Sequence, residues 1–241
     1  MTIQAITFDF WSTLYHHTQS PQGRRLQRIQ TALASAGRDD IGEAALSEAM
    51  ERAWDTWNRV WRGKCYTLGA AEWLRLVLEH VGGDLPAAIF SQSVAALETE
   101  ILTDTTVPVE GAAAVLARLA TQYQLGLISD TGIAPGRVLQ TRLERDGLRS
   151  YFTHLTFSDE FGRSKPHPDV FRDTLAQLQV APRQAVHVGD LLRTDISGAR
   201  GVGMYTVRYA GIRDDRDALY PDADAIIKNY STLEAVLERI Y

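Results

Sequence analysis

The chain has 241 residues, 45% hydrophobic and 23% charged, enough to bury the core of one large or two modest domains and too apolar for a disordered protein. The net charge of −5 gives no basic surface for nucleic acid. With one cysteine (Cys65), no leader pattern and no apolar run near 20 residues, the sequence predicts a cytoplasmic protein without an internal disulfide or membrane span.

The first 14 residues predict a buried strand followed by a turn. Residues 3–8 form an apolar run that ends at Asp9. A strand that ends in a carboxylate places that carboxylate at the rim of a sheet, where a ligand can reach it. Asp9 is therefore the first candidate for a functional residue.

The middle of the chain, residues 15–104, is predicted to be helical throughout. Glycines and a proline separate four candidate helices, which lie near residues 21–36, 41–61, 69–80 and 86–103. Successive helices with short connections indicate an antiparallel bundle. We therefore expect a helical domain over residues 15–106, inserted into a core formed by residues 1–14 and 107–241.

From Val107 onward, strands alternate with helices. The predicted strands cover residues 124–129, 154–157, 185–189, 205–209 and 225–227, and the predicted helices cover residues 110–121, 134–147, 168–179, 193–201 and 231–240. This order is typical of an α/β fold: a Rossmann-like, doubly wound parallel sheet that the N-terminal strand joins. Ligands of such sheets bind beyond the carboxyl ends of the strands, where Asp9, Ser129 and Asp190 fall.

Four segments of the chain resemble, in order, the motifs of the haloacid dehalogenase (HAD) superfamily. They are Asp9-Phe10-Trp11-Ser12-Thr13-Leu14, Leu127-Ile128-Ser129-Asp130, the stretch 164–171 that begins Ser164-Lys165-Pro166, and the stretch 188–200 that begins Val188-Gly189-Asp190. Each aspartate, serine or lysine taken singly could be an ordinary turn or capping residue. The inserted helical domain matches the position and character of the superfamily's helical (C1-type) cap, although we match no motif there.

The resemblance implies an enzyme with an aspartate nucleophile. Asp9 would attack the substrate and form a covalent intermediate that water then hydrolyses. A carboxylate approaches a phosphoryl anion only with a cation between them, and the resemblance implies Mg²⁺ held by the Asp9 carboxylate, the backbone carbonyl of Trp11 and Asp190. Asp195 would lie behind these ligands or help to hold Lys165.

Further roles follow from the same resemblance. Ser129 and Lys165 would bind the transferring group, with Lys165 neutralising charge in the transition state, and the adjacent Asp130 belongs to the same substrate-binding segment. Thr13 would fix the turn around Asp9. The substrate expected is a small molecule, a phosphate ester, with no nucleic acid or membrane partner, and the protein would be a monomer or a homodimer.

Trp11 departs from the superfamily pattern. HAD phosphatases usually carry a second aspartate there, which protonates the leaving oxygen, and an indole has no proton to give near neutral pH. One interpretation is a Mg²⁺-dependent phosphatase that prefers good leaving groups or uses His16, His17 or Asp159 as the acid. We favour it because Asp190, facing Asp9, calls for a cation.

Two other interpretations remain open. The 2-haloacid dehalogenases often have an aromatic residue at this position and need no acid or metal, because halide leaves as a stable anion. Their fourth motif differs from Val188-Gly189-Asp190, however, and the candidates for their cap arginine (Arg24, Arg25, Arg28 and Arg38) are all ambiguous. The third interpretation is a non-catalytic binding protein on a HAD scaffold, which would bind Mg²⁺ without turnover.

Three tryptophans share one face of a predicted cap helix. Trp54, Trp57 and Trp61 are spaced at i, i+3 and i+7. They could form the core of the cap, which we favour, or an aromatic wall over the substrate.

Overall fold

The computed structural model describes residues 2–103 and 105–240. Its centre is a six-stranded parallel sheet in the order β5-β4-β1-β6-β7-β8. The strands are β1 (Ala5–Phe8), β4 (Gln124–Ser129), β5 (His154–Phe157), β6 (Ala185–Gly189), β7 (Tyr205–Tyr209) and β8 (Ala225–Ile227). The predicted strands are therefore confirmed, with β1 paired on both sides, because every β1 residue is buried and has to lie inside the sheet.

Helices cover both faces of this sheet, so it is doubly wound as predicted. Apolar residues of α5 (Ala112–Leu119), α6 (Gly136–Arg145) and α10 (Leu233–Leu237) pack on the face that carries Ile6 and Phe8. Residues of α8 (Pro168–Gln177) and α9 (Ser197–Val202) pack with Ala5 on the other. The shorter helical turns are η2 (Arg149–Tyr151), α7 (Ser158–Phe161), η3 (Pro182–Gln184), η4 (Leu192–Ile196) and η5 (Tyr230–Thr232).

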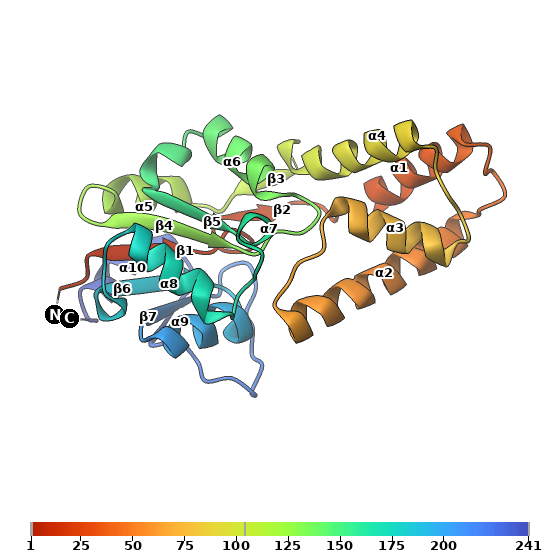
Figure 1. Cartoon of the computed structure of the whole chain (residues 1–241). Helices are drawn as coiled ribbons and strands as arrows, with labels where there is room; N and C mark the ends of the chain where they lie inside the picture. Colours follow the sequence, from red (N-terminus) through yellow and green to blue (C-terminus); the bar gives the residue numbers. More distant parts are fainter. Residues whose placement is uncertain (1, 104, 241) are drawn as a thin grey trace.

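The middle of the chain forms a helical cap. Its elements are α1 (Gln22–Ser35), α2 (Glu43–Lys64), α3 (Ala70–His80), α4 (Ala87–Glu98) and the 3₁₀ turn η1 (Thr99–Leu102). They enclose an apolar core of their own around the fully buried Trp73 and stand apart from the sheet, at the end opposite the two chain termini (Figure 1). The domain boundaries expected near residues 14 and 107 stay a prediction.

The expectation that residues 15–104 are helical throughout was wrong. Tyr15–His17 forms strand β2, which pairs antiparallel with β3 (Thr106–Pro108) where the chain leaves and re-enters the core (Figure 1). The partners are about 90 positions apart in the sequence, so no local periodicity could reveal them.

Several helix boundaries also differ from the prediction. The expected helix over 86–103 ends at Glu98 and continues as η1, and the expected helix over 193–201 begins as the π-helical turn η4. In the parts of the chain that the structure describes, no helix has the length and apolar character needed to cross a membrane.

Candidate active site

Neighbouring strands of the sheet bring the predicted motifs together. Asp9 follows β1, Asp130 follows β4 and Asp190 follows β6, and these strands are adjacent in the order β4-β1-β6. Because parallel strands end at the same edge, the three carboxylates converge on one cavity of about 210 Å³ at that edge. The cavity is also lined by Trp11, Lys165, Asp195 and the cap residues Trp57 and Trp61.

Lys165 connects the polar groups of the site through hydrogen bonds. It is 1% exposed, and its Nζ donates to Asp9 Oδ1 at 2.5 Å, to Asp195 Oδ1 at 2.6 Å and to the carbonyl of Ile128 at 2.9 Å. An ammonium group has three donors, so every one is used. Burial alone would lower the pKa of Lys165, but Asp195 and Asp9 hold it above its usual value, and the side chain stays charged.

Asp195 positions this lysine. Its Oδ1 contacts Lys165 and lies 3.1 Å from His187 Nε2, while Oδ2 accepts from the Leu191 N–H and the Thr194 hydroxyl, both at 3.1 Å. Although burial acts to raise it, the pKa of Asp195 is held below its usual value by Lys165. A Cβ on Gly189 would lie only 2.4 Å from Asp195 Cγ, so the glycine before Asp190 lets Asp195 approach.

Asp190 is a buried carboxylate at the end of β6. It is 3% exposed, and neither of its oxygens accepts a hydrogen bond within residues 2–103 and 105–240. Carboxylate oxygens of Asp9, Asp190 and Asp195 lie within 4.8 Å of one another. Burial and the negative charge of Asp9 raise the pKa of Asp190 well above its usual value. Burial and the charge of Asp195 likewise raise the pKa of Asp9, to about 7, although the positive charge of Lys165 acts to lower it.

This donor set fits a divalent cation. Four carboxylates and two cations, Lys165 and Arg213, line the cavity, which leaves an excess of negative charge in a largely buried place. Oxygen is the ligand type that Mg²⁺ prefers. Asp195 is already committed to Lys165, whereas Asp190 and the second oxygen of Asp9 accept no hydrogen bond in the described parts of the chain.

Two tryptophans of the cap contact the core beside the cavity. Trp61 Nε1 donates to Asp130 Oδ2 at 2.8 Å, and the guanidinium of Arg193 lies 4.0 Å from the centre of the Trp61 ring. Trp57 packs on the core at Gly132, where a Cβ would lie 3.2 Å from its ring. The three tryptophans therefore have different positions. Trp54 and Trp57 pack against the cap core, whereas Trp61, together with Trp57, lines the cavity.

Ser129 and Thr13 are not brought into the cavity. Ser129 is 1% exposed, and its hydroxyl makes only a long contact of 3.4 Å with the carbonyl of Asp130 among the described residues. The Thr13 hydroxyl is buried without a partner among those residues, while its carbonyl accepts from the Tyr230 hydroxyl. Asp130 itself accepts from the backbone N–H of Lys165 at 2.8 Å, which ties the second motif to the third.

None of the three proposed substitute acids is among the described residues that line this cavity. His17 lies beside Trp11, with ring centres 4.9 Å apart and the rings tilted by 30°, and burial lowers its pKa. Asp159 instead accepts from the Gly136 N–H at 3.1 Å, at the start of α6.

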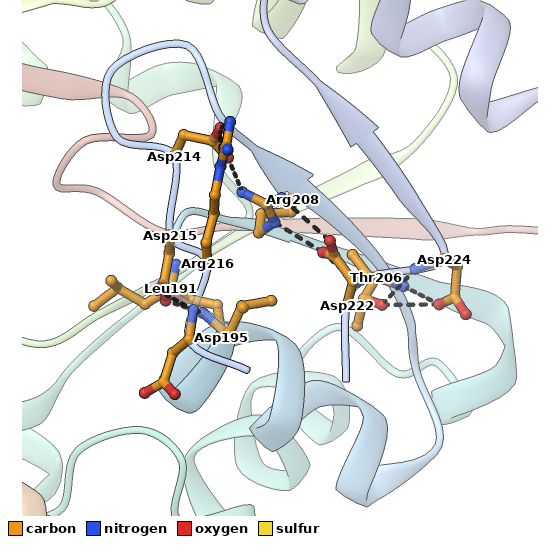
Figure 2. Close-up of polar contacts among 12 residues, drawn as sticks. Leu191, Asp195, Thr206, Arg208, Asp214, Asp215, Arg216, Asp222 and Asp224 are labelled. Atoms are coloured by element: carbon orange, nitrogen blue, oxygen red, sulfur yellow. Dashed lines mark hydrogen bonds and ion pairs between the residues drawn. The ribbon is translucent and has the colours of Figure 1, made fainter. Parts of the chain in front are cut away.

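Sequence reasoning missed Arg213, which lines the cavity from the loop between β7 and β8. This loop is anchored by ion pairs between the buried Arg208 of β7 and both Asp214 and Asp222 (Figure 2). In addition, Asp215 accepts a hydrogen bond from the Leu192 N–H at 2.8 Å. The charged run Arg213-Asp214-Asp215-Arg216-Asp217 was the available signal.

Known proteins resemble this chain in sequence and in fold. A glyceraldehyde 3-phosphate phosphatase of Pyrococcus furiosus is 39% identical over 134 residues, which cover 54% of this chain and 55% of that enzyme. The enzyme of the same name from Methanopyrus kandleri is 27% identical over 207 residues, covering 86% of this chain and 83% of its own. The chain thus matches about half the length of the first relative and most of the second.

A solved structure matches over the full length of both chains. It is a 2-haloacid dehalogenase from Pseudomonas syringae pv. Tomato DC3000, with a TM-score of 0.69 and 26% sequence identity. The sequence model of the haloacid dehalogenase-like hydrolases matches residues 3–203, which include Asp9, Lys165, Asp190 and Asp195. The chain therefore belongs to the haloacid dehalogenase-like hydrolase family.

Proposed function

We propose that this protein is a Mg²⁺-dependent phosphatase that acts on a small phosphorylated metabolite. The observation that carries the proposal is Asp190, a buried carboxylate beside Asp9 that accepts no hydrogen bond and forms no close ion pair within the described residues, although the more distant Arg213 and Lys165 act on its charge. A dehalogenase without a metal would gain nothing from this charge, which raises the energy of the neighbouring nucleophile. The relatives named glyceraldehyde 3-phosphate phosphatase support the same reaction class.

Asp9 is the proposed nucleophile. Its carboxylate attacks phosphorus, the bond from phosphorus to the leaving oxygen breaks, and water then hydrolyses the resulting aspartyl phosphate. Mg²⁺ would be held by the Asp9 and Asp190 carboxylates and the backbone carbonyl of Trp11, and it would neutralise charge between nucleophile and phosphoryl group. Lys165 fixes Asp9 through its 2.5 Å contact and supplies positive charge to the transferring group.

Trp11 replaces the usual acid in this proposal. The indole offers no titratable proton, so the leaving oxygen has to depart with little help or take a proton from elsewhere. His17, whose ring lies beside that of Trp11, is the titratable group we propose among those that the sequence suggested. We expect the enzyme to favour esters of acidic alcohols, such as p-nitrophenyl phosphate, over alkyl phosphates.

The test measures phosphate release from a panel of phosphate esters, with Mg²⁺ and with a chelator, and halide release from 2-chloropropionate. We expect phosphate release that the chelator abolishes and that the Asp9→Asn variant lacks. Halide release that resists the chelator would overturn the proposal in favour of a dehalogenase.

A dehalogenase is the second candidate. It is favoured by Trp11 and by the full-length match to the Pseudomonas syringae dehalogenase. Mg²⁺ binding without turnover of any ester or haloacid would point instead to a binding protein on this scaffold.

A further inference from the structure

A buried histidine contacts the active site from within the sheet. His187 of β6 is 0% exposed and is the register partner of Thr7 in β1, so the two side chains lie side by side on one face of the sheet. Asp190 and Asp9 follow the same two strands. Neither His187 nor Thr7 is among the described residues that line the active-site cavity, so any effect on the reaction has to pass through another residue.

The hydrogen bonds of His187 lead from Thr7 to Asp195. Its Nδ1 lies 2.8 Å from Thr7 Oγ1, and its Nε2 lies 3.1 Å from Asp195 Oδ1. Asp195 is ionised beside Lys165 and can only accept, so Nε2 carries the hydrogen. Burial lowers the pKa of His187, although the hydrogen bond to Asp195 acts to raise it, and the ring is therefore neutral with a bare Nδ1. The Thr7 hydroxyl donates to that nitrogen, so both hydrogen bonds have a defined direction.

Asp195 uses all its acceptor positions. An ionised carboxylate has about four lone-pair sites. In Asp195, Oδ1 accepts from Lys165 and His187, and Oδ2 accepts from Leu191 and Thr194. The carboxylate therefore cannot turn toward a cation in the cavity without giving up one of these hydrogen bonds. His187 contacts the same oxygen as Lys165, so its hydrogen bond restrains the oxygen that holds the lysine.

Packing alone does not call for this polar pair. The His187 ring packs against Phe171 of α8, with ring centres 5.3 Å apart and the ring planes at 86°. Valine and phenylalanine would fill the volumes of Thr7 and His187, and replacing both partners of a buried hydrogen bond by apolar groups of the same shape is nearly neutral for stability. The polar pair adds one feature that an apolar pair lacks, an N–H directed at Asp195.

We propose that His187 is a positioning residue for the reaction at Asp9. Its Nε2–H fixes Asp195, and Asp195 holds Lys165 against the nucleophile, where the contact from Lys165 Nζ to Asp9 Oδ1 is 2.5 Å. The inference rests on the proposed phosphatase function, in which Lys165 supplies positive charge to the transferring group. Without the N–H, Asp195 is free to turn and the ammonium group loses its fixed place beside Asp9. The loss should fall on kcat more than on KM, because this charge counts most in the transition state.

Two amide variants separate the roles of the two ring nitrogens. His187→Gln places an N–H near the position of Nε2, within reach of Asp195. His187→Asn has a shorter side chain and reaches only the position of Nδ1, beside Thr7. Both put an amide in the same buried place, so their costs in stability should be similar, and only the glutamine keeps the N–H to Asp195. His187→Phe keeps a ring of similar size and removes both hydrogen bonds.

Thr174→Val is the matched control for the loss of a buried hydrogen bond. Thr174 of α8 is also 0% exposed, and its hydroxyl bonds to Thr156 at 2.7 Å and to the Val170 carbonyl at 2.6 Å instead of to the groups that hold Lys165. Each variant is assayed for its melting temperature and for kcat and KM with p-nitrophenyl phosphate and Mg²⁺. Calorimetry with Mg²⁺ and beryllofluoride, a phosphoryl mimic, adds a dissociation constant that requires no turnover.

A spectroscopic measurement reads the hydrogen bonds of the ring directly. NMR of wild-type protein with isotope-labelled histidine rings shows which ring nitrogen carries hydrogen, and the signal of His187 is assigned by its absence from His187→Gln. We expect hydrogen on Nε2, where it points at Asp195.

We expect kcat to fall by about 10- to 100-fold in His187→Phe and in His187→Asn, the range for partners that orient a functional group from outside the site. His187→Gln should restore most of the lost kcat. Thr174→Val should lower the melting temperature without changing kcat. The affinity for beryllofluoride should follow the same order as kcat, because the mimic would bind Asp9 beside Lys165.

Equal kcat values in His187→Gln and His187→Asn, or a bare Nε2 on His187, would overturn the inference. Losses of kcat that simply follow the melting temperatures, with Thr174→Val included, would overturn it as well. If the wild-type protein releases no phosphate from any ester, the proposed function fails, and the order of beryllofluoride affinities then decides whether His187 positions Lys165. A wild type that shows neither turnover nor beryllofluoride binding would overturn both.

Discussion

Replacing Arg208 with methionine tests how the loop beside the active site is held. Arg208 lies in β7 with its side chain 4% exposed, and it donates to Asp222 at 2.8 and 3.2 Å and to Asp214 at 2.8 Å (Figure 2). Asp214 immediately follows Arg213, which lines the cavity. Methionine fills a similar volume without charge, so the substitution removes three hydrogen bonds and little packing.

The expected loss of stability in Arg208→Met depends on how exposed the two aspartates that pair with Arg208 are. Breaking a fully buried ion pair costs about 3–5 kcal/mol, whereas an exposed pair contributes about 0–1 kcal/mol. Arg208 is buried, but the Asp214 and Asp222 side chains are 31% and 47% exposed and regain water when the guanidinium is lost. We therefore expect Arg208→Met to lower the free energy of unfolding by about 2 kcal/mol.

This contribution also depends on pH. The Arg208 guanidinium, followed by Arg216, holds the pKa of Asp214 at about 2, and Arg208 lowers the pKa of Asp222 as well. A carboxylate with a lowered pKa in the folded state stabilises the fold above its unfolded pKa and loses that effect as pH falls through its folded pKa. The difference between wild type and Arg208→Met should therefore be complete near pH 6 and narrow as pH falls from 4 toward 2.

Urea denaturation at a series of pH values measures both effects. Arg216→Met is the matched control, because Arg216 pairs with the same Asp214 but has a side chain that is 81% exposed. Its unfolding midpoint should equal that of wild type. Equal midpoints for Arg208→Met and Arg216→Met, or a difference that does not change with pH, would refute the argument that burial makes Arg208 the anchor.

Three further outcomes are expected. Trp61→Phe keeps the ring over Arg193 but loses the 2.8 Å hydrogen bond to Asp130, so KM for phosphate esters should rise by about 5- to 10-fold in steady-state assays; an unchanged KM would show that this contact does not hold the cap. Asp190→Asn should raise the Mg²⁺ concentration for half-maximal activity by roughly 10- to 100-fold in a metal titration; an unchanged concentration would show that Asp190 is not a metal ligand. Gly189→Ala places a methyl group against Asp195 and should reduce kcat and the melting temperature together; wild-type values for both would contradict the crowding.

Much of the fold could be predicted from the sequence because its signals are local. Apolar runs such as residues 185–189 indicated buried strands, and the order of strands and helices indicated a parallel sheet. Once the strands are parallel, their carboxyl ends meet, so the convergence of Asp9 and Asp190 followed from topology alone, whereas from β4 it is Asp130 that lines the cavity and not Ser129. The contact between Asp195 and Lys165 was one of two roles expected for Asp195.

What was missed depends on contacts between distant segments. The pairing of Tyr15 with Pro108 leaves no periodic pattern in a three-residue strand. Arg213 faces the cavity because ion pairs several residues away fix its loop. Ser129 stands at the end of β4, as expected, but the direction of its side chain is set by packing, and it is buried outside the cavity lining.

The paired strands β2 and β3 join the cap to the loop that follows Asp9. Both chain crossings run through this one narrow ribbon, whose Tyr15 carbonyl accepts from the Ser12 N–H at 2.7 Å and whose neighbour Leu14 accepts from the Val109 N–H at 2.8 Å. A rotation of the cap about this ribbon would therefore shift residues 11–14, immediately after Asp9. Under the proposed function, we expect any movement of the cap to displace the proposed nucleophile as well.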